Sequence, residues 1–182
     1  MANAIGMVEY VTVSIGVQAA DIMVKTSEVE ILEAKVVCPG KYIVIISGDL
    51  SAVNAAVEAS KVKFPKKLID SFVLGNPHES IYPAMYGTSV VEDVNALGVI
   101  ETFSAASAIV AADVCAKTSI VDLIELRLAH GMCGKSYVMI TGEVAAVQAA
   151  IDKAKIGTGD KGMLLDSAVI PRPDRKLIKS II

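Results

Sequence analysis

The feature that most constrains this chain is an internal repeat. A shift of about 92 residues lays the first half over the second in a single order, nearly from end to end. Residues 4–9 read AIGMVE, for example, and residues 96–101 read ALGVIE. The other matching pairs are 19–21 with 111–113, 25–27 with 117–119, 41–48 with 135–142, 52–53 with 146–147, and 71–74 with 167–170. We interpret the chain as a tandem duplication, with one domain over residues 1–91 and a second over 92–182.

Each copy predicts the order strand, helix, strand, strand, helix, strand. Residues 5–13 are apolar and β-branched, as in a largely buried strand, and residues 42–46 form an apolar run typical of a central strand. Residues 15–26 are small and helix-compatible, while residues 124–128 alternate between apolar and charged side chains, the period of a half-buried strand. Asp49 stands where it could cap the second helix. These patterns favour an α+β fold with helices packed on antiparallel sheets.

The composition excludes several classes of protein. Among 182 residues, 17 Lys and Arg stand against 20 Asp and Glu, which gives a formal net charge of −3. That balance lacks the basic footprint that nonspecific nucleic-acid binding needs, so we expect no nucleic-acid partner. With 53% hydrophobic residues the chain has ample apolar surface for folding. The mean hydropathy of +0.56 would be explained by extensive subunit interfaces, because such interfaces resemble a core cut in half.

We expect no membrane span and no secretory signal. The best candidate span, residues 105–112, contains Ser107, ends at Asp113 and is far shorter than the roughly 18 apolar residues a span requires. The N-terminus begins Met-Ala-Asn-Ala, without a basic region before an apolar segment. The three cysteines are then expected in a reducing compartment, as ligands or core residues rather than disulfides. These features favour a cytoplasmic protein.

The sharpest local motif is Cys38-Pro39-Gly40-Lys41, between two predicted strands. Proline and glycine favour a tight turn, which can present the preceding cysteine to solvent or to a symmetry axis. The alternative is a buried cysteine that acts as a small hydrophobic residue. One cysteine cannot hold a metal centre, whereas three copies of it in a threefold assembly could.

The equivalent loop of the second copy reads HGMCGK and contains two further candidate metal ligands, His130 and Cys133. Two ligands are too few for a closed site, and Cys133 is the stronger candidate because its loop takes the place of the Cys38 loop. Cys115 lies among alanines and valine on a predicted helix, so we expect it in the core. His78 follows Asn-Pro and is expected on a surface loop.

The sequence supplies no catalytic constellation, and we expect a protein that is not an enzyme. Residues 157–162 spell G-x-G-x-x-G, but a dinucleotide site needs that motif after a strand and at the start of a helix. Here it follows a predicted helix and leads into a strand, so we interpret it as a connecting loop. No Walker loop, nucleophile elbow or catalytic carboxylate pair is present. Glu9 and Glu101 are related by the repeat, which favours a structural role.

The duplicated pattern resembles the shell-protein domain of bacterial microcompartments. The resemblance rests on AIGMVE, the A-D-x-x-x-K segment, a Gly-Lys turn into an apolar strand, Gly-Asp, and the ending Val169-Ile170-Pro171-Arg172-Pro173, and it covers essentially the whole chain. Two copies in this order are similar to tandem, unpermuted shell proteins with ferredoxin-like domains, which form trimers shaped like hexamers. The Cys38 turn closely resembles the pore loop of the iron–sulfur-bearing tandem shell protein of propanediol-utilisation compartments.

This resemblance implies a flat tile in a microcompartment shell with a central pore. The expected pore-lining residues are Cys38, Pro39, Gly40, His130, Gly131, Met132, Cys133 and Gly134. In the cluster-bearing subtype one cysteine per subunit holds a [4Fe–4S] cluster on the threefold axis, one cluster per trimer, and Cys38 matches that position. The subtype usually has glycine where this chain has Cys133, which leaves open whether Cys133 completes the cluster, binds a second metal or lines the pore.

The resemblance also implies the partners. It places the tile-edge residues Asp21, Lys25, Asp113, Lys117 and Arg172 against neighbouring shell hexamers and trimers, and it suggests an enclosed redox enzyme. The simpler interpretation of Asp21 and Lys25 is an exposed ion pair on one helix, which would stabilise that helix by a few tenths of a kcal/mol. The cluster would pass electrons across the shell or be transported through it. One alternative is a cluster-free tile with a metabolite pore, and another is a small-ligand-binding or enzymatic α+β protein with a site between subunits.

Overall fold

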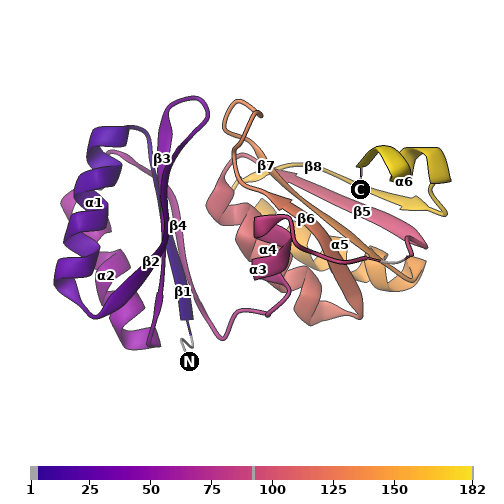
Figure 1. Cartoon of the computed structure of the whole chain (residues 1–182), viewed down its shortest axis with the longest axis horizontal. Coiled ribbons are helices and arrows are strands. Elements are labelled where there is room, and N and C mark those ends of the chain that lie inside the picture. The colour runs from indigo at the N-terminus through magenta and orange to yellow at the C-terminus, as the bar shows by residue number, and fades with distance from the viewer. Residues whose placement is uncertain (1–3, 92, 182) are drawn as a thin grey trace. The chain divides into compact units, whose positions relative to one another are not determined.

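The computed structural model describes residues 4–91 and 93–181. Its elements follow the predicted order with two additions, and Figure 1 labels them along the chain. The first repeat contains β1 (Ala4–Tyr10), α1 (Val13–Thr26), β2 (Val29–Val37), β3 (Lys41–Gly48), α2 (Leu50–Lys63) and β4 (Leu68–Gly75). The second contains β5 (Ala96–Thr102), α4 (Ala105–Thr118), β6 (Val121–Arg127), β7 (Ser136–Gly142), α5 (Val144–Gly159) and β8 (Leu164–Pro171). The additions are the short helices α3 (Ile81–Tyr86) and α6 (Arg175–Ile181).

Each repeat forms its own four-stranded sheet, and the two sheets have the same topology. The strand order is β2-β3-β1-β4 in the first and β6-β7-β5-β8 in the second, and every neighbouring pair is antiparallel. The registers also agree, because Glu9 lies opposite Ile43 and Asp70 while the equivalent Glu101 lies opposite Tyr137 and Asp166. The predicted α+β fold with antiparallel sheets is therefore confirmed, and equivalent residues of the two repeats can be compared position by position.

The core of the first repeat lies between its sheet and the helices α1 and α2, which Figure 1 draws on the same side of that sheet. The buried cluster consists of Ala4, Val8, Tyr10, Ala19, Ala20, Met23, Val44, Ile46, Val53, Ala56 and Val57. Tyr10 is fully buried, and its hydroxyl lies 2.6 Å from Ser60 Oγ, which satisfies both polar groups inside the core. Helices and sheet are thus held together by apolar burial, and the contact of Tyr10 with Ser60 adds a polar interaction within the core.

Helix α1 approaches β3 so closely that only glycine fits at the contact. A Cβ added to Gly16 would lie 2.4 Å from the Cβ and Cδ1 atoms of Tyr42. The second repeat solves the same contact differently, since Ala108 stands in place of Gly16 and Ser136 in place of Tyr42, and both are fully buried. A small helix residue therefore accompanies the large strand residue, and a larger helix residue accompanies the small one.

Several sequence-based details change in the structure. The first strand ends at Tyr10 rather than at residue 13, because Val13 already begins α1. Asp49 occupies the predicted N-cap position of α2, but its side chain makes no capping hydrogen bond. The expected connecting loop at residues 157–162 is partly helical, since Gly157 and Gly159 lie in the last turn of α5 before the chain reaches β8. The earlier part of α5 buries Val147, Ala150, Ile151 and Ala154 at helical spacing, so the helix continues through two glycines despite their cost.

The described chain divides into two compact units that differ slightly from the two repeats. The first unit contains the residues up to Pro77 together with Ser104–Ala106 and Ala129–Gly134, and the second contains the remainder. Two short segments of the second repeat therefore cluster with the first sheet. Among the described residues no helix combines the length and the apolar character that crossing a bilayer requires.

Candidate functional site: the Cys38 and Cys133 loops

The Cys38 turn is held by backbone hydrogen bonds at both ends. The Gly40 N–H donates to the Val37 carbonyl at 2.9 Å, and the Cys38 N–H donates to the Ala129 carbonyl at 3.0 Å. Gly40 has φ +108°, a left-handed conformation that favours glycine, which explains the Pro-Gly sequence of the turn. Cys38 is half-buried, whereas Pro39 and Gly40 are exposed. The predicted tight turn is confirmed, and its cysteine is not a core residue.

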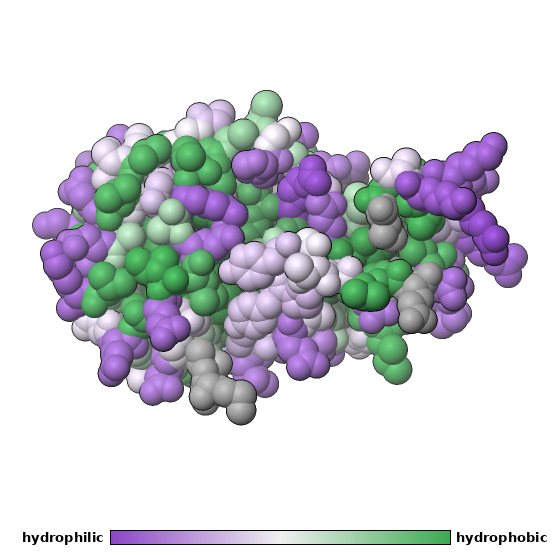
Figure 2. Space-filling view, viewed as in Figure 1, coloured by the Kyte–Doolittle hydropathy of each residue, from purple (hydrophilic) through white to green (hydrophobic). Residues whose placement is uncertain are grey.

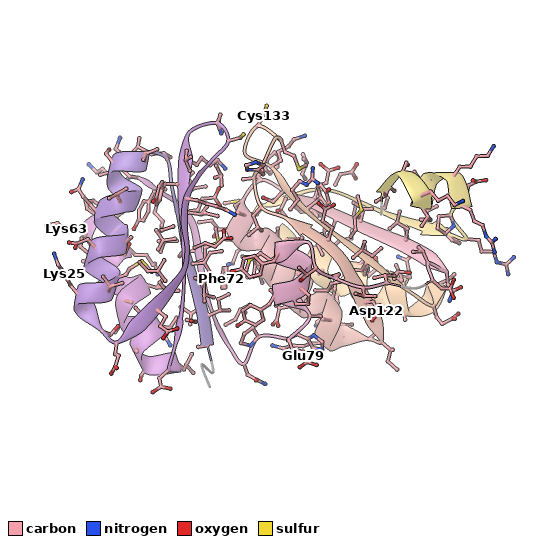
Figure 3. The ribbon with its side chains drawn as sticks, in the orientation of Figure 1. Lys25, Lys63, Phe72, Glu79, Asp122 and Cys133 are labelled. Atoms are coloured by element: carbon pink, nitrogen blue, oxygen red, sulfur yellow. The ribbon has the colours of Figure 1, made fainter. Side chains whose placement is uncertain are left out.

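The second loop, residues 129–134, lies beside this turn in the first compact unit. Ala129, Gly131, Cys133 and Gly134 all have positive φ values between 51° and 87°, so the loop is a series of left-handed turns. Cys133 is exposed, and Figure 3 labels it at the tip of the loop between β6 and β7. The structure therefore brings both predicted pore-loop cysteines into one part of the fold.

Lys41 connects the two loops to the interior of the sheet. Its Nζ lies 2.8 Å from Glu9 Oε1 and donates to the Gly134 carbonyl at 3.0 Å. The other Glu9 oxygen, Oε2, accepts the Ala105 N–H at 2.9 Å. The Glu9 side chain is fully buried and that of Lys41 is 15% exposed. Gly134 has no room for a larger residue, because an added Cβ would lie 2.8 Å from Lys41 Cε and 3.0 Å from the Cys38 carbonyl oxygen.

The electrostatics of Glu9 follow from its burial. Loss of hydration raises the pKa of the Glu9 carboxyl, and this effect exceeds the opposing influences of Lys41 and of the Ala105 and Ala106 N–H groups. Lys41 and the two N–H groups nevertheless favour the ionised form of Glu9. The buried carboxylate is thus costly in itself, and it is paired with Lys41 and with the N–H groups at the start of α4.

The remaining candidate ligands, Cys115 and His130, differ in their burial. Cys115 is fully buried, as predicted, and burial raises the pKa of its thiol to about 12, so it is not a thiolate ligand. His130 is exposed on the second loop. Within residues 4–91 and 93–181 no group of three or more His, Cys, Asp or Glu side chains lies close enough to hold a metal ion.

The predicted edge residues occupy two different environments. Lys25 Nζ lies 2.7 Å from Asp21 Oδ2, and both side chains are more than half exposed, on α1. Lys117 makes the same 2.7 Å contact with Asp113, but the Asp113 side chain is only 7% exposed and also accepts the His78 N–H at 2.8 Å. His78 is accordingly half-buried rather than free on the surface.

Lys41 was not predicted as a site residue from the sequence, and Glu9 was predicted to have no more than a structural role. A signal was present, because a carboxylate recurs inside an otherwise apolar strand of both repeats, at Glu9 and Glu101, and a lysine follows the turn glycine in both, at Lys41 and Lys135. A buried charge of this kind requires a partner of opposite sign. That requirement alone would have paired the glutamate with the lysine across neighbouring strands.

The chain resembles known shell proteins over its whole length. The model of the BMC domain matches residues 4–77 and 96–173. The bacterial microcompartment shell protein PduT of Citrobacter freundii is 37% identical over 182 residues, which is 100% of this chain and 99% of the relative. The crystal structure of a microcompartment protein from Desulfitobacterium hafniense DCB is 45% identical, with a TM-score of 0.84 over 97% of this chain and 98% of that one.

A more distant structure shares the fold alone. The fused permuted hexameric shell protein of the RMM microcompartment is 19% identical, with a TM-score of 0.64 over 86% of this chain and 81% of that one. The family resemblance inferred from AIGMVE, the Gly-Lys turns and the C-terminal strand is confirmed. With two matched domains in tandem and a full-length relative, the chain belongs to the BMC-domain family of bacterial microcompartment shell proteins.

Proposed function

We propose that the chain is a non-enzymatic shell tile, that three copies close around a central pore, and that Cys38 from each copy holds one [4Fe–4S] cluster in that pore. The loops of residues 38–40 and 129–134 would line the pore. Neighbouring tiles would meet the edges that carry Lys25 and Arg172. The cluster would serve electron transfer to enclosed redox enzymes, or would itself be transported across the shell.

The observation that carries this proposal is the setting of Cys38. Its thiol is half-buried on a turn fixed by hydrogen bonds from Gly40 and to Ala129, whereas the thiol of Cys115 is buried in the core. A rigid, partly exposed thiol suits a ligand that converges with its symmetry copies. The full-length similarity to the PduT shell protein supports the same assignment.

The residues fit a cluster only if copies of the chain share it. A [4Fe–4S] cluster supplies one-electron transfer and is normally held by four cysteine thiolates. Three copies of Cys38 leave one iron without a cysteine from this set, and solvent or a small molecule would supply its fourth ligand. A cluster on the axis would fill the pore that these loops line, and other solutes would therefore be excluded from it.

Two serine variants test the role of Cys38 with a matched control. In anaerobically purified protein, Cys38→Ser is expected to abolish the visible absorption and the EPR signal of the cluster while electron microscopy still shows assembled sheets. Cys133→Ser makes the same substitution in the neighbouring loop and is expected to retain the absorption.

The outcomes separate the proposal from its alternative. Unchanged spectra in Cys38→Ser would overturn the assignment of the ligand. Colourless wild-type protein that assembles normally, even after reconstitution with iron and sulfide, would favour a cluster-free tile with a metabolite-conducting pore.

A further inference from the structure

A pocket of about 610 Å³ lies in the second unit, where the chain leaves β8 and forms the helix α6. We call it the C-terminal pocket. Its lining residues come from the segment 91–95, just before β5, and from the segment 172–179. A pocket of this volume is large enough for a small organic ligand, and such ligands are fixed by a few polar groups beside an apolar wall.

The C-terminal pocket carries more positive than negative charge. Arg172, Arg175 and Lys179 line it together with a single acidic residue, Asp93. Among the residues that the structure describes, none of the three cationic side chains makes a hydrogen bond or an ion pair. The nearby Asp174 does not neutralise them, because its Oδ1 accepts a backbone N–H at the start of α6 at 2.7 Å. The cations are therefore available to an anionic ligand, although the whole chain has a formal net charge of −3.

The backbone at Arg172 is unusual for an arginine. Arg172 has φ +51°, in the left-handed region, and it precedes Pro173, although a residue before proline is normally extended. The first repeat places Asn76 at the equivalent position, also before a proline and with φ +56°. Asparagine tolerates this conformation, whereas arginine adopts it at a cost. Backbone strain of this kind is typical of positions whose side chain has a function.

The two walls of the C-terminal pocket are tied together, and part of their surface is apolar. The Arg172 N–H donates to the Asn95 carbonyl at 2.9 Å, which joins the segment after β8 to the segment before β5. Val91, Val94 and Ile178 line the pocket and are half-buried. Figure 2 shows hydrophobic residues next to strongly hydrophilic ones at the end of the second unit where Figure 1 draws α6. The pocket thus offers an apolar wall beside a cationic one.

We propose that the C-terminal pocket binds a small organic molecule that carries a diphosphate group. The diphosphate would contact the side chains of Arg172, Arg175 and Lys179. The organic part would pack on the apolar wall formed by Val91 and Ile178. This inference goes beyond the proposed tile and depends on neither its iron–sulfur cluster nor its ring of copies.

The charges of the pocket favour a diphosphate over a singly charged ligand. Three cationic side chains against one carboxylate leave an excess of two positive charges, which a monoanion would only half neutralise. A guanidinium binds phosphate through two parallel hydrogen bonds, and a lysine binds it as a point charge. Two arginines and one lysine therefore suit two linked phosphoryl groups.

Adenosine diphosphate is a suitable probe, because it joins a diphosphate to a flat base. Isothermal titration calorimetry of the wild-type protein is expected to show saturable binding with one site per chain. The affinity should fall as the salt concentration rises, since salt screens exposed charges. Wild-type protein that shows no saturable binding of adenosine diphosphate at low salt would overturn the proposal.

Two lysines of α6 provide a matched pair of variants. Lys179 lines the pocket, whereas Lys176 is exposed on the same helix and does not. Lys179→Gln is expected to weaken the binding of adenosine diphosphate about tenfold, the effect of losing one hydrogen bond to a charged group. Lys176→Gln removes the same charge and is expected to leave the affinity unchanged. Equal weakening in both variants would mean general attraction of anions and would contradict a site.

Inorganic pyrophosphate tests the apolar wall separately, because it has the diphosphate without the organic part. Ile178→Ala is expected to weaken the binding of adenosine diphosphate severalfold and to leave the binding of pyrophosphate unchanged, which also shows that the pocket persists in this variant. Equal loss of both ligands would contradict the assigned apolar contact. Binding of adenosine diphosphate by iron-free protein, or by protein that forms no sheets, would support this inference while overturning the proposed tile.

Discussion

Replacing Glu9 with alanine is expected to lower the free energy of unfolding by about 3 kcal/mol, because removing one member of a buried ion pair leaves the other charge uncompensated. The variant would leave Lys41, which is 15% exposed, and the Ala105 N–H without the carboxylate that both contact. Urea denaturation followed by circular dichroism measures the change. A loss of less than about 0.5 kcal/mol, the usual range for surface substitutions, would contradict the assigned contacts.

A double replacement separates the cost of the lone charge from the value of the pair. Glu9→Leu with Lys41→Met is expected to recover most of the stability lost in Glu9→Ala, since a buried ion pair replaced by apolar residues is often neutral or stabilising. If the double variant is as unstable as Glu9→Ala, the uncompensated lysine is not the cause of the loss.

The raised pKa of Glu9 gives a pH dependence of known sign. The native state holds the Glu9 proton more tightly than the unfolded chain, so the contribution of this group to stability is fully present below the ordinary carboxyl pKa of 4.5. It is lost as the pH rises from there through the raised native pKa. The free energy of unfolding of the wild type minus that of Glu9→Gln should therefore decrease over this window, as pH-dependent denaturation would measure.

Gly16→Ala is expected to destabilise the protein by about 1–3 kcal/mol, the usual cost of overpacking a core. Alanine is normally the better helix former by up to about 1 kcal/mol, so a loss of stability would come from the contact and not from the helix. The added Cβ would lie 2.4 Å from Tyr42, inside any van der Waals contact. Thermal unfolding of the variant, with Ser14→Ala on the exposed side of α1 as the control, measures the effect.

The second repeat supplies the compensating change. Ala108 and Ser136 occupy the equivalent positions, so Gly16→Ala with Tyr42→Ser copies a pair that this chain already uses. The two changes should be less destabilising together than the sum of the single changes, because residues in contact are not additive. If the two changes in the free energy of unfolding are strictly additive, α1 must relieve the clash between the Cβ added at residue 16 and Tyr42 by shifting, and not through the smaller side chain at residue 42.

The fold could be predicted largely from the sequence, since the duplication and the period of each segment carry enough information. Apolar runs at residues 42–46 and alternation at 124–128 are local signals that persist in the tertiary structure. The end of the first strand was harder to place, because Val11 and Val13 have strand propensity while α1 already begins at Val13. Short helices such as α3 lack a full apolar period and escaped prediction for that reason.

The candidate site was only partly predictable. The turn at Cys38 follows from proline and glycine, and the core position of Cys115 follows from its apolar helix. The contact of Glu9 with the Ala105 N–H joins residues 96 positions apart, so no local pattern reveals it. The repeat alone could not show that equivalent residues such as Glu9 and Glu101 differ in burial, because a single chain gives the two repeats different neighbours.

The ratio of iron to protein chain tests the central claim most directly. Iron and acid-labile sulfide would be determined on anaerobically purified wild-type protein whose assembly mass is known from native mass spectrometry. A cluster shared through Cys38 predicts about four irons and four sulfides for every three chains. Four irons on each single chain, or iron-free rings after attempted reconstitution, would contradict it.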